Sequence, residues 1–234
     1  MLQLNNITVQ VGKKKILHDI SCSFEMGKIY AVMGPNGSGK STLACIVAGH
    51  PGYTVSNGTI SFKSEDITKL EPEKRVHKGI FMTFQSPIAL SGVTIYQLMR
   101  YALNGKKDPL TIRKEVQKYA KMLNISELLL DRSLNEGFSG GERKKMEVLQ
   151  AAILDPSLIF FDEIDTGVDI DALKTIAFCI KKMHNKNKTF ILITHYNRLL
   201  KYLTPDEVFI LNEGTVVKRG NALLAEHIEK HGYQ

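Results

Sequence analysis

Long apolar runs are scarce in this chain of 234 residues. The longest, such as residues 158–161 and 191–193, fall far short of the roughly 20 residues that cross a bilayer as a helix. The sequence also opens directly into an alternating apolar and polar pattern, without a charged and then apolar leader. We therefore expect no direct membrane insertion, and a location in the cytoplasm or an equivalent reducing organelle compartment.

Cysteine is equally scarce. Cys22, Cys45 and Cys179 are odd in number and widely separated, and no C-x-x-C pair occurs among them. This pattern argues against a disulfide framework and against a metal or cluster site built by this chain alone. Small, buried core residues are the expected role for all three.

Aromatic residues are missing from the basic segments, although the net charge of +7 could point to nucleic acid. The positive charge gathers at residues 13–15 and 181–188. Proteins that bind single strands interleave such charges with aromatic stacking residues. We therefore favour a solvated basic surface and expect no nucleic-acid partner, and nucleic-acid binding stays as an alternative.

The pattern of apolar residues predicts an α/β fold. Alternation over residues 2–9 and 16–24, around a lysine-rich turn, predicts an antiparallel β-layer at the N-terminus. Later strands are predicted at 28–33, 58–62, 80–84, 158–161, 189–193, 207–211 and 215–217, with 58–62 and 80–84 taken as a pair. Helices are predicted at 41–49, 95–130 with a break at 106–109, 140–154, 171–182 and the C-terminus. Strands that alternate with helices predict a mainly parallel sheet flanked by helices.

Repeats, low-complexity tracts and linkers are absent from the sequence. A single domain is therefore expected over residues 1–234. Its catalytic core, with the N-terminal antiparallel β-subdomain, is expected at about 1–85 and 156–234, and a helical subdomain at about 86–155.

Residues 34–41, G-P-N-G-S-G-K-S, match the phosphate-binding loop (P-loop, Walker A) in full, between a predicted strand and a predicted helix. Glycines let the backbone wrap around phosphate, and the helix N-terminus adds partial positive charge. Lys40 can reach the β- and γ-phosphates, and the Ser41 hydroxyl can bind Mg²⁺. The alternative, a glycine-rich turn that matches by chance, does not explain the flanking strand and helix. The predicted nucleotide-binding residues are Gly34, Pro35, Asn36, Gly37, Ser38, Gly39, Lys40, Ser41 and Thr42.

Residues 158–163, L-I-F-F-D-E, form an apolar run that ends in two carboxylates. A strand buried on both faces has this composition, and ligands of open α/β sheets gather at the carboxyl ends of strands. We predict that Asp162 holds Mg²⁺, directly or through water. Glu163 is then placed to polarise the water that attacks the γ-phosphate.

A third motif, F-S-G-G-E at 138–142, opens a predicted helix about 20 residues before that strand. With it, the chain resembles the ATP-binding-cassette (ABC) ATPase family, whose core has the P-loop fold. The resemblance rests on the order of the P-loop, Gln85, Ser139-Gly140-Gly141, Asp162-Glu163, Asp169 and His195.

The resemblance implies that two such domains meet head to tail in a transient, ATP-dependent homodimer. The signature residues Ser139, Gly140, Gly141 and Glu142 would then face the γ-phosphate bound by the opposite subunit. It also implies that Gln85, at the end of a strand, senses Mg²⁺ and the attacking water, and that Asp169 lies in the loop that communicates across the dimer. His195 would touch the γ-phosphate. Taken alone, a histidine after a strand is more often structural.

Two features depart from the family pattern. No aromatic residue occurs at residues 9–11, where most members stack on adenine, which leaves the base contact unassigned. The signature also reads F-S-G-G-E rather than the commoner L-S-G-G-Q.

The second departure resembles one subgroup, the SufC-type ATPases of the SUF iron–sulfur cluster assembly system. The same likeness extends over segments 79–87, 162–174, 194–196, 205–206, 217–218 and 232–233. That likeness implies ATP and Mg²⁺ as cofactors and soluble scaffold partners of the SufB and SufD type, with segment 86–94 as the docking site. The alternatives are the nucleotide-binding subunit of an ABC membrane transporter, which shares every catalytic motif, and a cassette protein linked to nucleic acid.

Overall fold

The computed structural model describes residues 1–233 as two compact units. The core unit contains Met1–Met82, Ser157–Glu163 and the chain from His184 onward. The helical unit contains Thr83–Pro156 and Ile164–Met183. Residues 164–183, which the sequence placed with the catalytic core, thus group with the helical unit.

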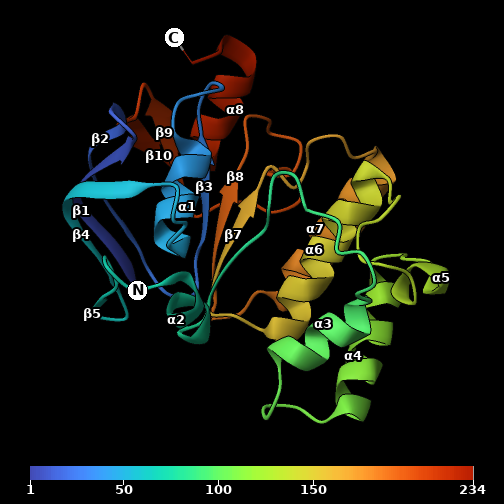
Figure 1. Cartoon of the computed structure of the whole chain (residues 1–234). Helices are drawn as coiled ribbons and strands as arrows, with labels where there is room; N and C mark the ends of the chain where they lie inside the picture. Colours follow the sequence, from blue (N-terminus) through green and yellow to red (C-terminus); the bar gives the residue numbers. More distant parts are fainter. Residues whose placement is uncertain (234) are drawn as a thin grey trace. The chain divides into compact units, whose positions relative to one another are not determined.

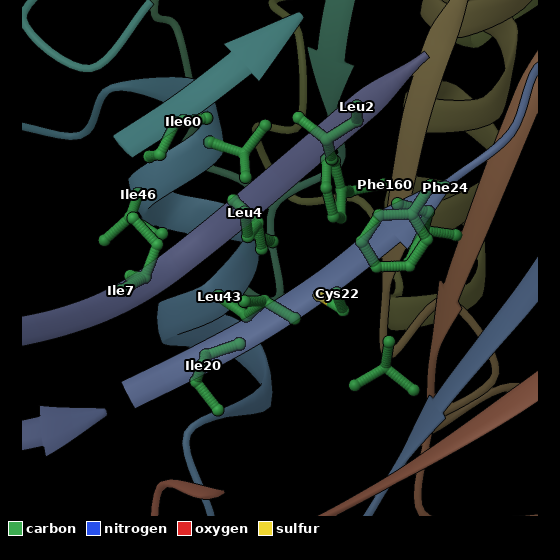
Figure 2. Packing of buried hydrophobic residues seen from close by; sticks show 14 of the residues in the cluster. Leu2, Leu4, Ile7, Ile20, Cys22, Phe24, Leu43, Ile46, Ile60 and Phe160 are labelled. Atoms are coloured by element: carbon green, nitrogen blue, oxygen red, sulfur yellow. The ribbon is translucent and has the colours of Figure 1, made fainter. Parts of the chain in front are cut away.

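The core unit begins with an antiparallel sheet of four strands in the order β2-β1-β4-β5. These strands are β1 (Leu2–Val11), β2 (Lys14–Phe24), β4 (Thr54–Phe62) and β5 (Glu65–Asp66). The predicted alternation appears in β1, where Leu2, Leu4 and Ile7 are buried and the residues between them are exposed. Figure 2 shows these side chains packed with Leu43 and Ile46 of a neighbouring helix. Burial of each such side chain contributes about 1.5–3 kcal/mol.

The second sheet has six strands in the order β10-β9-β3-β8-β7-β6, parallel except for the edge pair of β9 and β10. They are β3 (Ile29–Met33), β6 (Ile80–Met82), β7 (Leu158–Asp162), β8 (Thr189–Ile193), β9 (Glu207–Asn212) and β10 (Thr215–Gly220). Every residue of β3, β7 and β8 is buried, as the continuous apolar runs predicted.

Three helices complete the core unit (Figure 1): α1 (Lys40–Ala48), α2 (Pro72–His77) and α8 (Ala222–His231). α1 packs against strands of both sheets, and α8 packs on β9 and β10.

The helical unit consists of α3 (Ile95–Ala102), α4 (Pro109–Met122), α5 (Glu127–Leu130), α6 (Gly140–Leu154) and α7 (Ile170–Met183). The predicted break at 106–109 is real, because Asp108 caps α4 through the amides of Leu110 and Thr111. The predicted α/β class, with its antiparallel sheet, mainly parallel sheet and helical part, is confirmed.

One predicted pairing is wrong. Segments 58–62 and 80–84 do not form a strand pair, because β4 pairs with β1 in the first sheet and β6 pairs with β7 in the second. β6 also ends at Met82, so Gln85 lies three residues beyond the strand rather than at its end. The helix α2 falls in a stretch that the sequence analysis treated as connecting sequence.

Cys22 and Cys179 are buried and Cys45 is partly buried, and all three are free thiols. Burial raises the pKa of Cys22 to about 12 and that of Cys179 to about 12, so both stay protonated. Across residues 1–233, no helix has the length and apolar character that a membrane span needs.

Candidate active site

The phosphate loop connects β3 to α1 and depends on glycine at two positions. Gly34 has φ 155°, and a Cβ atom there would lie 2.1 Å from the carbonyl oxygen of Leu211. Gly39 has φ 100° and directly precedes α1. No side chain larger than hydrogen fits at position 34, so the loop backbone keeps its conformation only with glycine there.

Two residues of the loop, Ser38 and Gly37, indicate that it has room for a ligand. The Ser38 hydroxyl is buried and has no hydrogen-bond partner among residues 1–233. A Cβ atom at the exposed Gly37 would meet nothing within 4 Å. A buried hydroxyl without a partner is costly, and an anion in the loop would satisfy it. The residues present therefore fit a bound phosphate chain.

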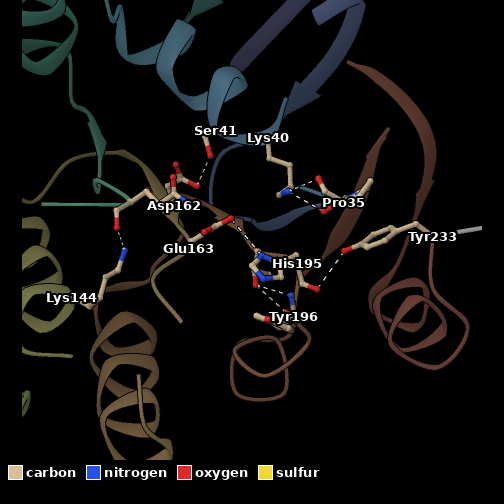
Figure 3. Close-up of polar contacts among 12 residues, drawn as sticks. Pro35, Lys40, Ser41, Lys144, Asp162, Glu163, His195, Tyr196 and Tyr233 are labelled. Atoms are coloured by element: carbon tan, nitrogen blue, oxygen red, sulfur yellow. Dashed lines mark hydrogen bonds and ion pairs between the residues drawn. The ribbon is translucent and has the colours of Figure 1, made fainter. Parts of the chain in front are cut away.

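The Lys40 side chain folds back over its own loop (Figure 3), where Nζ donates to the carbonyl oxygens of Gly34 at 2.9 Å and Pro35 at 3.0 Å. Lys40 is only 4% exposed. Burial lowers its pKa, and the charges of Glu163 and Asp162 oppose that shift. The ammonium group thus lies beside two carboxylates and over the loop, where it can reach an anionic ligand.

Ser41 and Asp162 form an oxygen pair, with 3.1 Å between the Ser41 Oγ and the Asp162 Oδ1. Asp162 is buried at the end of β7, where it is paired in register with Ile193 of β8. A hydroxyl and a carboxylate are the hard oxygen ligands that suit Mg²⁺, together with substrate phosphate oxygens. These two side chains therefore fit the predicted metal.

Glu163 follows Asp162 in the left-handed region, with φ 47°, and its amide donates to the carbonyl of Ile193. This backbone conformation is unusual for a residue with a Cβ atom. The Glu163 carboxylate points toward His195, away from Asp162 (Figure 3). The Glu163 Oε1 lies 3.4 Å from the His195 Nδ1, an ion-pair distance without hydrogen-bond geometry (Figure 3). Glu163 is 7% exposed, so the carboxylate is held in a largely desolvated position.

His195 lies just after β8, and its ring contacts that of Tyr196 in a tilted arrangement, with 3.9 Å between the centroids and 48° between the planes. The amide of Tyr196 donates to the Thr194 hydroxyl at 3.0 Å, which fixes the turn after the strand. Sequence order alone did not show that His195 and Glu163 are neighbours.

The convergence of these residues follows from strand order. β3, β8 and β7 are adjacent and parallel, so their carboxyl ends lie at one edge of the sheet. The core unit thereby brings together Lys40, Ser41, Asp162, Glu163 and His195.

In the helical unit, Ser139 begins α6 with a capping box. Its hydroxyl accepts from the amide of Glu142 at 3.3 Å, and the Glu142 Oε2 accepts from the amide of Ser139 at 2.7 Å. Hydrogen bonds from the backbone and side chain of Ser139 lower the pKa of Glu142. A Cβ atom at Gly140 or Gly141 would make only ordinary contacts, so packing within this unit does not require either glycine.

Gln85 is exposed, and its backbone is held from α6. The Lys144 Nζ donates to the carbonyls of Gln85 at 2.8 Å and Phe84 at 3.3 Å. The Glu147 Oε2 accepts from the amide of Phe84 at 2.6 Å. Two buried charges on the signature helix therefore fix the segment that carries Gln85.

Asp169 precedes α7 and accepts from the amide of Ala172 at 2.8 Å. This bond caps the helix, so Asp169 has a local structural role in addition to the role in dimer communication predicted from the resemblance.

The sequence analysis missed three polar residues around the site. Lys144 and Glu147 lie at buried positions of α6, and charges on the buried face of a predicted helix could have indicated them. Tyr233 contacts the backbone of His195, and the sequence marked it only as part of the closing Gly232-Tyr233 pair that resembles the SufC-type subgroup, without a role at the site.

A phosphate loop beside an acidic strand end in this two-sheet fold defines a P-loop ATPase of the ATP-binding-cassette class. Residues 17–166 match the family described as ABC transporter, and the chain belongs to this family as an ATP-hydrolysing enzyme. The fold agrees with a crystal structure of an ATP-binding cassette of an ABC transporter in its ADP conformation, at a TM-score of 0.78 and 28% identity, covering 99% of this chain and 95% of that chain.

Two relatives match along their whole length. The chain is 43% identical to "Probable ATP-dependent transporter ycf16" of Antithamnion sp., over 100% of this chain and 96% of the relative. It is 41% identical to "Probable ATP-dependent transporter SufC" of Escherichia coli, over 100% of this chain and 97% of the relative. The resemblance to SufC-type ATPases is thus confirmed at the level of sequence.

Proposed function

We propose that this ATPase drives conformational change in a soluble scaffold of the SufB and SufD type during iron–sulfur cluster assembly. The observation that carries the proposal is the 41% identity to SufC over the whole chain, signature helix and C-terminal segment included. The catalytic part rests on the geometry at the carboxyl ends of β3, β7 and β8.

In this proposal the loop amides, the Ser38 hydroxyl and Lys40 bind the phosphates of ATP. Ser41, Asp162 and Gln85 hold Mg²⁺, which when bound neutralises charge on the β- and γ-phosphates. Glu163 orients the attacking water and accepts its proton as the new oxygen–phosphorus bond forms. The bond between the γ-phosphorus and the bridging oxygen breaks, and ADP leaves with that oxygen. His195 contacts the γ-phosphate from the next strand.

The helical unit acts on a second copy of the chain. The first amides of α6 are donors at a helix N-terminus, which suits an anion. Packing within the helical unit would tolerate a side chain at Gly140 or Gly141. Glycine at these positions is therefore better explained by a ligand that comes close to the backbone. ATP would therefore favour a closed homodimer, and hydrolysis would release it.

The scaffold docks on segment 86–94. This segment is fixed by the Asn135 Nδ2, which donates to the carbonyl of Ile88 at 2.9 Å, and by Lys144 and Glu147 around Phe84. Ile88 is 69% exposed, and Phe84, two residues before the segment, is 53% exposed, so the segment and its N-terminal flank present apolar side chains. Exposed apolar residues on an anchored loop are suited to a protein partner.

Affinity purification of the tagged chain from its own cells, under low oxygen, tests the proposal. Co-elution of soluble SufB/SufD-like proteins that carry iron and sulfide is the expected result, and Ile88→Asp should weaken their capture. A matched variant at the exposed Leu128 of α5, Leu128→Asp, should not.

The second candidate is the nucleotide-binding subunit of a membrane transporter, which is favoured by the description of both relatives as probable ATP-dependent transporters. Co-elution of integral membrane proteins would support it and would leave the ATPase chemistry unchanged.

A further inference from the structure

The side chain of Tyr233 lies between two loops of the candidate site. Its hydroxyl is 3.4 Å from the carbonyl oxygen of His195, to which it donates (Figure 3). The amide of Gly34, the first residue of the phosphate loop, lies near the same oxygen and opposes the rise in the pKa of this hydroxyl. One phenol group thus bonds to the loop after β8 and lies next to the loop after β3.

Gly34 is held from a second side as well. Its carbonyl oxygen accepts from the Lys40 Nζ at 2.9 Å, while its amide faces Tyr233. A side chain at this position would collide with the carbonyl of Leu211, so the backbone cannot be fixed by ordinary packing of a Cβ atom. The Lys40 hydrogen bond and the neighbouring Tyr233 hydroxyl therefore contribute directly to the position of the phosphate loop.

The helix α8, which ends just before Tyr233, is bonded to the segment that follows His195. The Glu229 Oε2 accepts from the Asn197 Nδ2 at 3.0 Å, and its Oε1 lies 3.2 Å from the Lys201 Nζ. Asn197 is only 5% exposed, so this anchor is partly shielded from water. These two contacts tie α8 to the segment that follows His195.

Gly232 then ends the helix and turns the chain inward. It has φ 79°, in the region that favours glycine, and its amide donates to the carbonyl of Ile228 at 2.8 Å. The turn carries Tyr233 back over the site, where burial raises the pKa of its hydroxyl and keeps it protonated as a donor.

We infer that Tyr233 is a positioning residue for ATP hydrolysis, which sets the His195 loop against the phosphate loop from the C-terminal helix. The inference rests on the roles proposed above for His195 and the phosphate loop. Tyr233 does not itself bind the nucleotide in this account. Its loss should lower kcat by misplacing His195, and should leave KM for ATP nearly unchanged because Lys40 and the loop amides bind the phosphates.

The test compares Tyr233→Phe with Tyr202→Phe in the full chain. The first removes only the bridging hydroxyl, and the second removes a hydroxyl from a tyrosine that is 41% exposed in the same unit. We expect Tyr233→Phe to lower kcat about five- to tenfold, the effect of one lost hydrogen bond, with KM changed less than about twofold. Tyr202→Phe should match the parent, and thermal unfolding of the two variants should coincide.

His195→Ala, measured in parallel, separates this inference from the proposed function. Full turnover by His195→Ala would overturn the role proposed for that histidine. If His195→Ala is slow and Tyr233→Phe keeps the parent's kcat, the positioning role alone is wrong. A rise in KM for ATP with unchanged kcat in Tyr233→Phe would also contradict it, because Tyr233 would then act in nucleotide binding.

Discussion

The hydroxyl of Ser41 lies 3.1 Å from the Oδ1 of Asp162, although 121 residues separate them in the chain. One residue belongs to the first turn of α1 and the other to the end of β7. Their meeting joins the phosphate loop to the acidic strand end and gives the enzyme a place for a metal ion between substrate and protein. The predictions below follow from this arrangement and from the buried charges around it.

Glu163→Gln should retain ATP binding and lose turnover by at least about a hundredfold, because general-base catalysis contributes factors of that order. Gln keeps the size of the side chain but cannot accept the proton from water. Steady-state hydrolysis and equilibrium nucleotide binding check the two halves of the prediction. Glu73→Gln, an exposed glutamate on α2, serves as the control and should behave like the parent. Turnover by Glu163→Gln close to the parental rate would remove the assignment of the base.

Lys40→Ala should weaken ATP binding by about tenfold or more, because a charge-assisted contact to phosphate is lost from a buried position. The Nζ now bonds to the carbonyls of Gly34 and Pro35, so the variant also leaves these acceptors without their donor. Calorimetric titration with ATP measures the loss. Lys63→Ala, an exposed lysine in the same unit, should bind as the parent does. Equal affinity in Lys40→Ala and Lys63→Ala would contradict the binding role.

Glu147 makes stability depend on pH. Burial raises its pKa to about 7 from 4.5, so the folded state binds more protons than the unfolded state between these values. The stability from protonated Glu147 is therefore fully present below about pH 4.5 and is lost as pH rises through about 7.

Subtraction of a Glu147→Gln variant isolates this effect. The free energy of unfolding of the parent, minus that of the variant, should fall by up to about 3 kcal/mol between acid and alkaline pH. Urea unfolding at a series of pH values measures it. Glu127→Gln, at an exposed site on α5, should give a difference that does not change with pH in this way. A flat difference for Glu147→Gln would show that its carboxyl titrates normally.

Arg75 stabilises the C-terminal end of α1 through hydrogen bonds to its backbone. It is 3% exposed, and it donates to the carbonyls of Ile46 and Val47 at 2.7 and 3.1 Å and of Leu70 and Thr68 at 2.7 and 3.0 Å. Arg75→Met should destabilise the fold by about 3 kcal/mol, because two buried and two part-buried acceptors lose their donor. Urea unfolding compares it with Lys74→Met, an exposed change on the same helix, which should have little effect. Equal unfolding midpoints for the two variants would contradict the stabilising role of the Arg75 hydrogen bonds.

The strands and helices of this protein could be largely predicted because their apolar periods are local. Alternation marks β1, and continuous apolar runs mark β7 and β8. The partner of β4 could not be predicted, because pairing with β1 rather than β6 is set by contacts between distant residues. α2 has only six residues, although Pro72 at its first turn is a usable signal.

The candidate site shows the same division. The phosphate loop, Asp162 and Glu163 follow motifs in which chemistry fixes residue type and spacing. Arg75, Lys144 and Tyr233 act through backbone groups of other segments, and a backbone acceptor has no sequence signature. Their roles could be recognised only in three dimensions.

The most direct test of the central claim is ATP turnover by the purified chain before and after addition of purified SufB/SufD-like scaffold from the same source. We expect slow hydrolysis by the chain alone and a several-fold increase with the scaffold, which Ile88→Asp should abolish while keeping the basal rate. Turnover that is unaffected by the scaffold but rises with a co-purified membrane partner would contradict the assembly role and favour a transporter subunit.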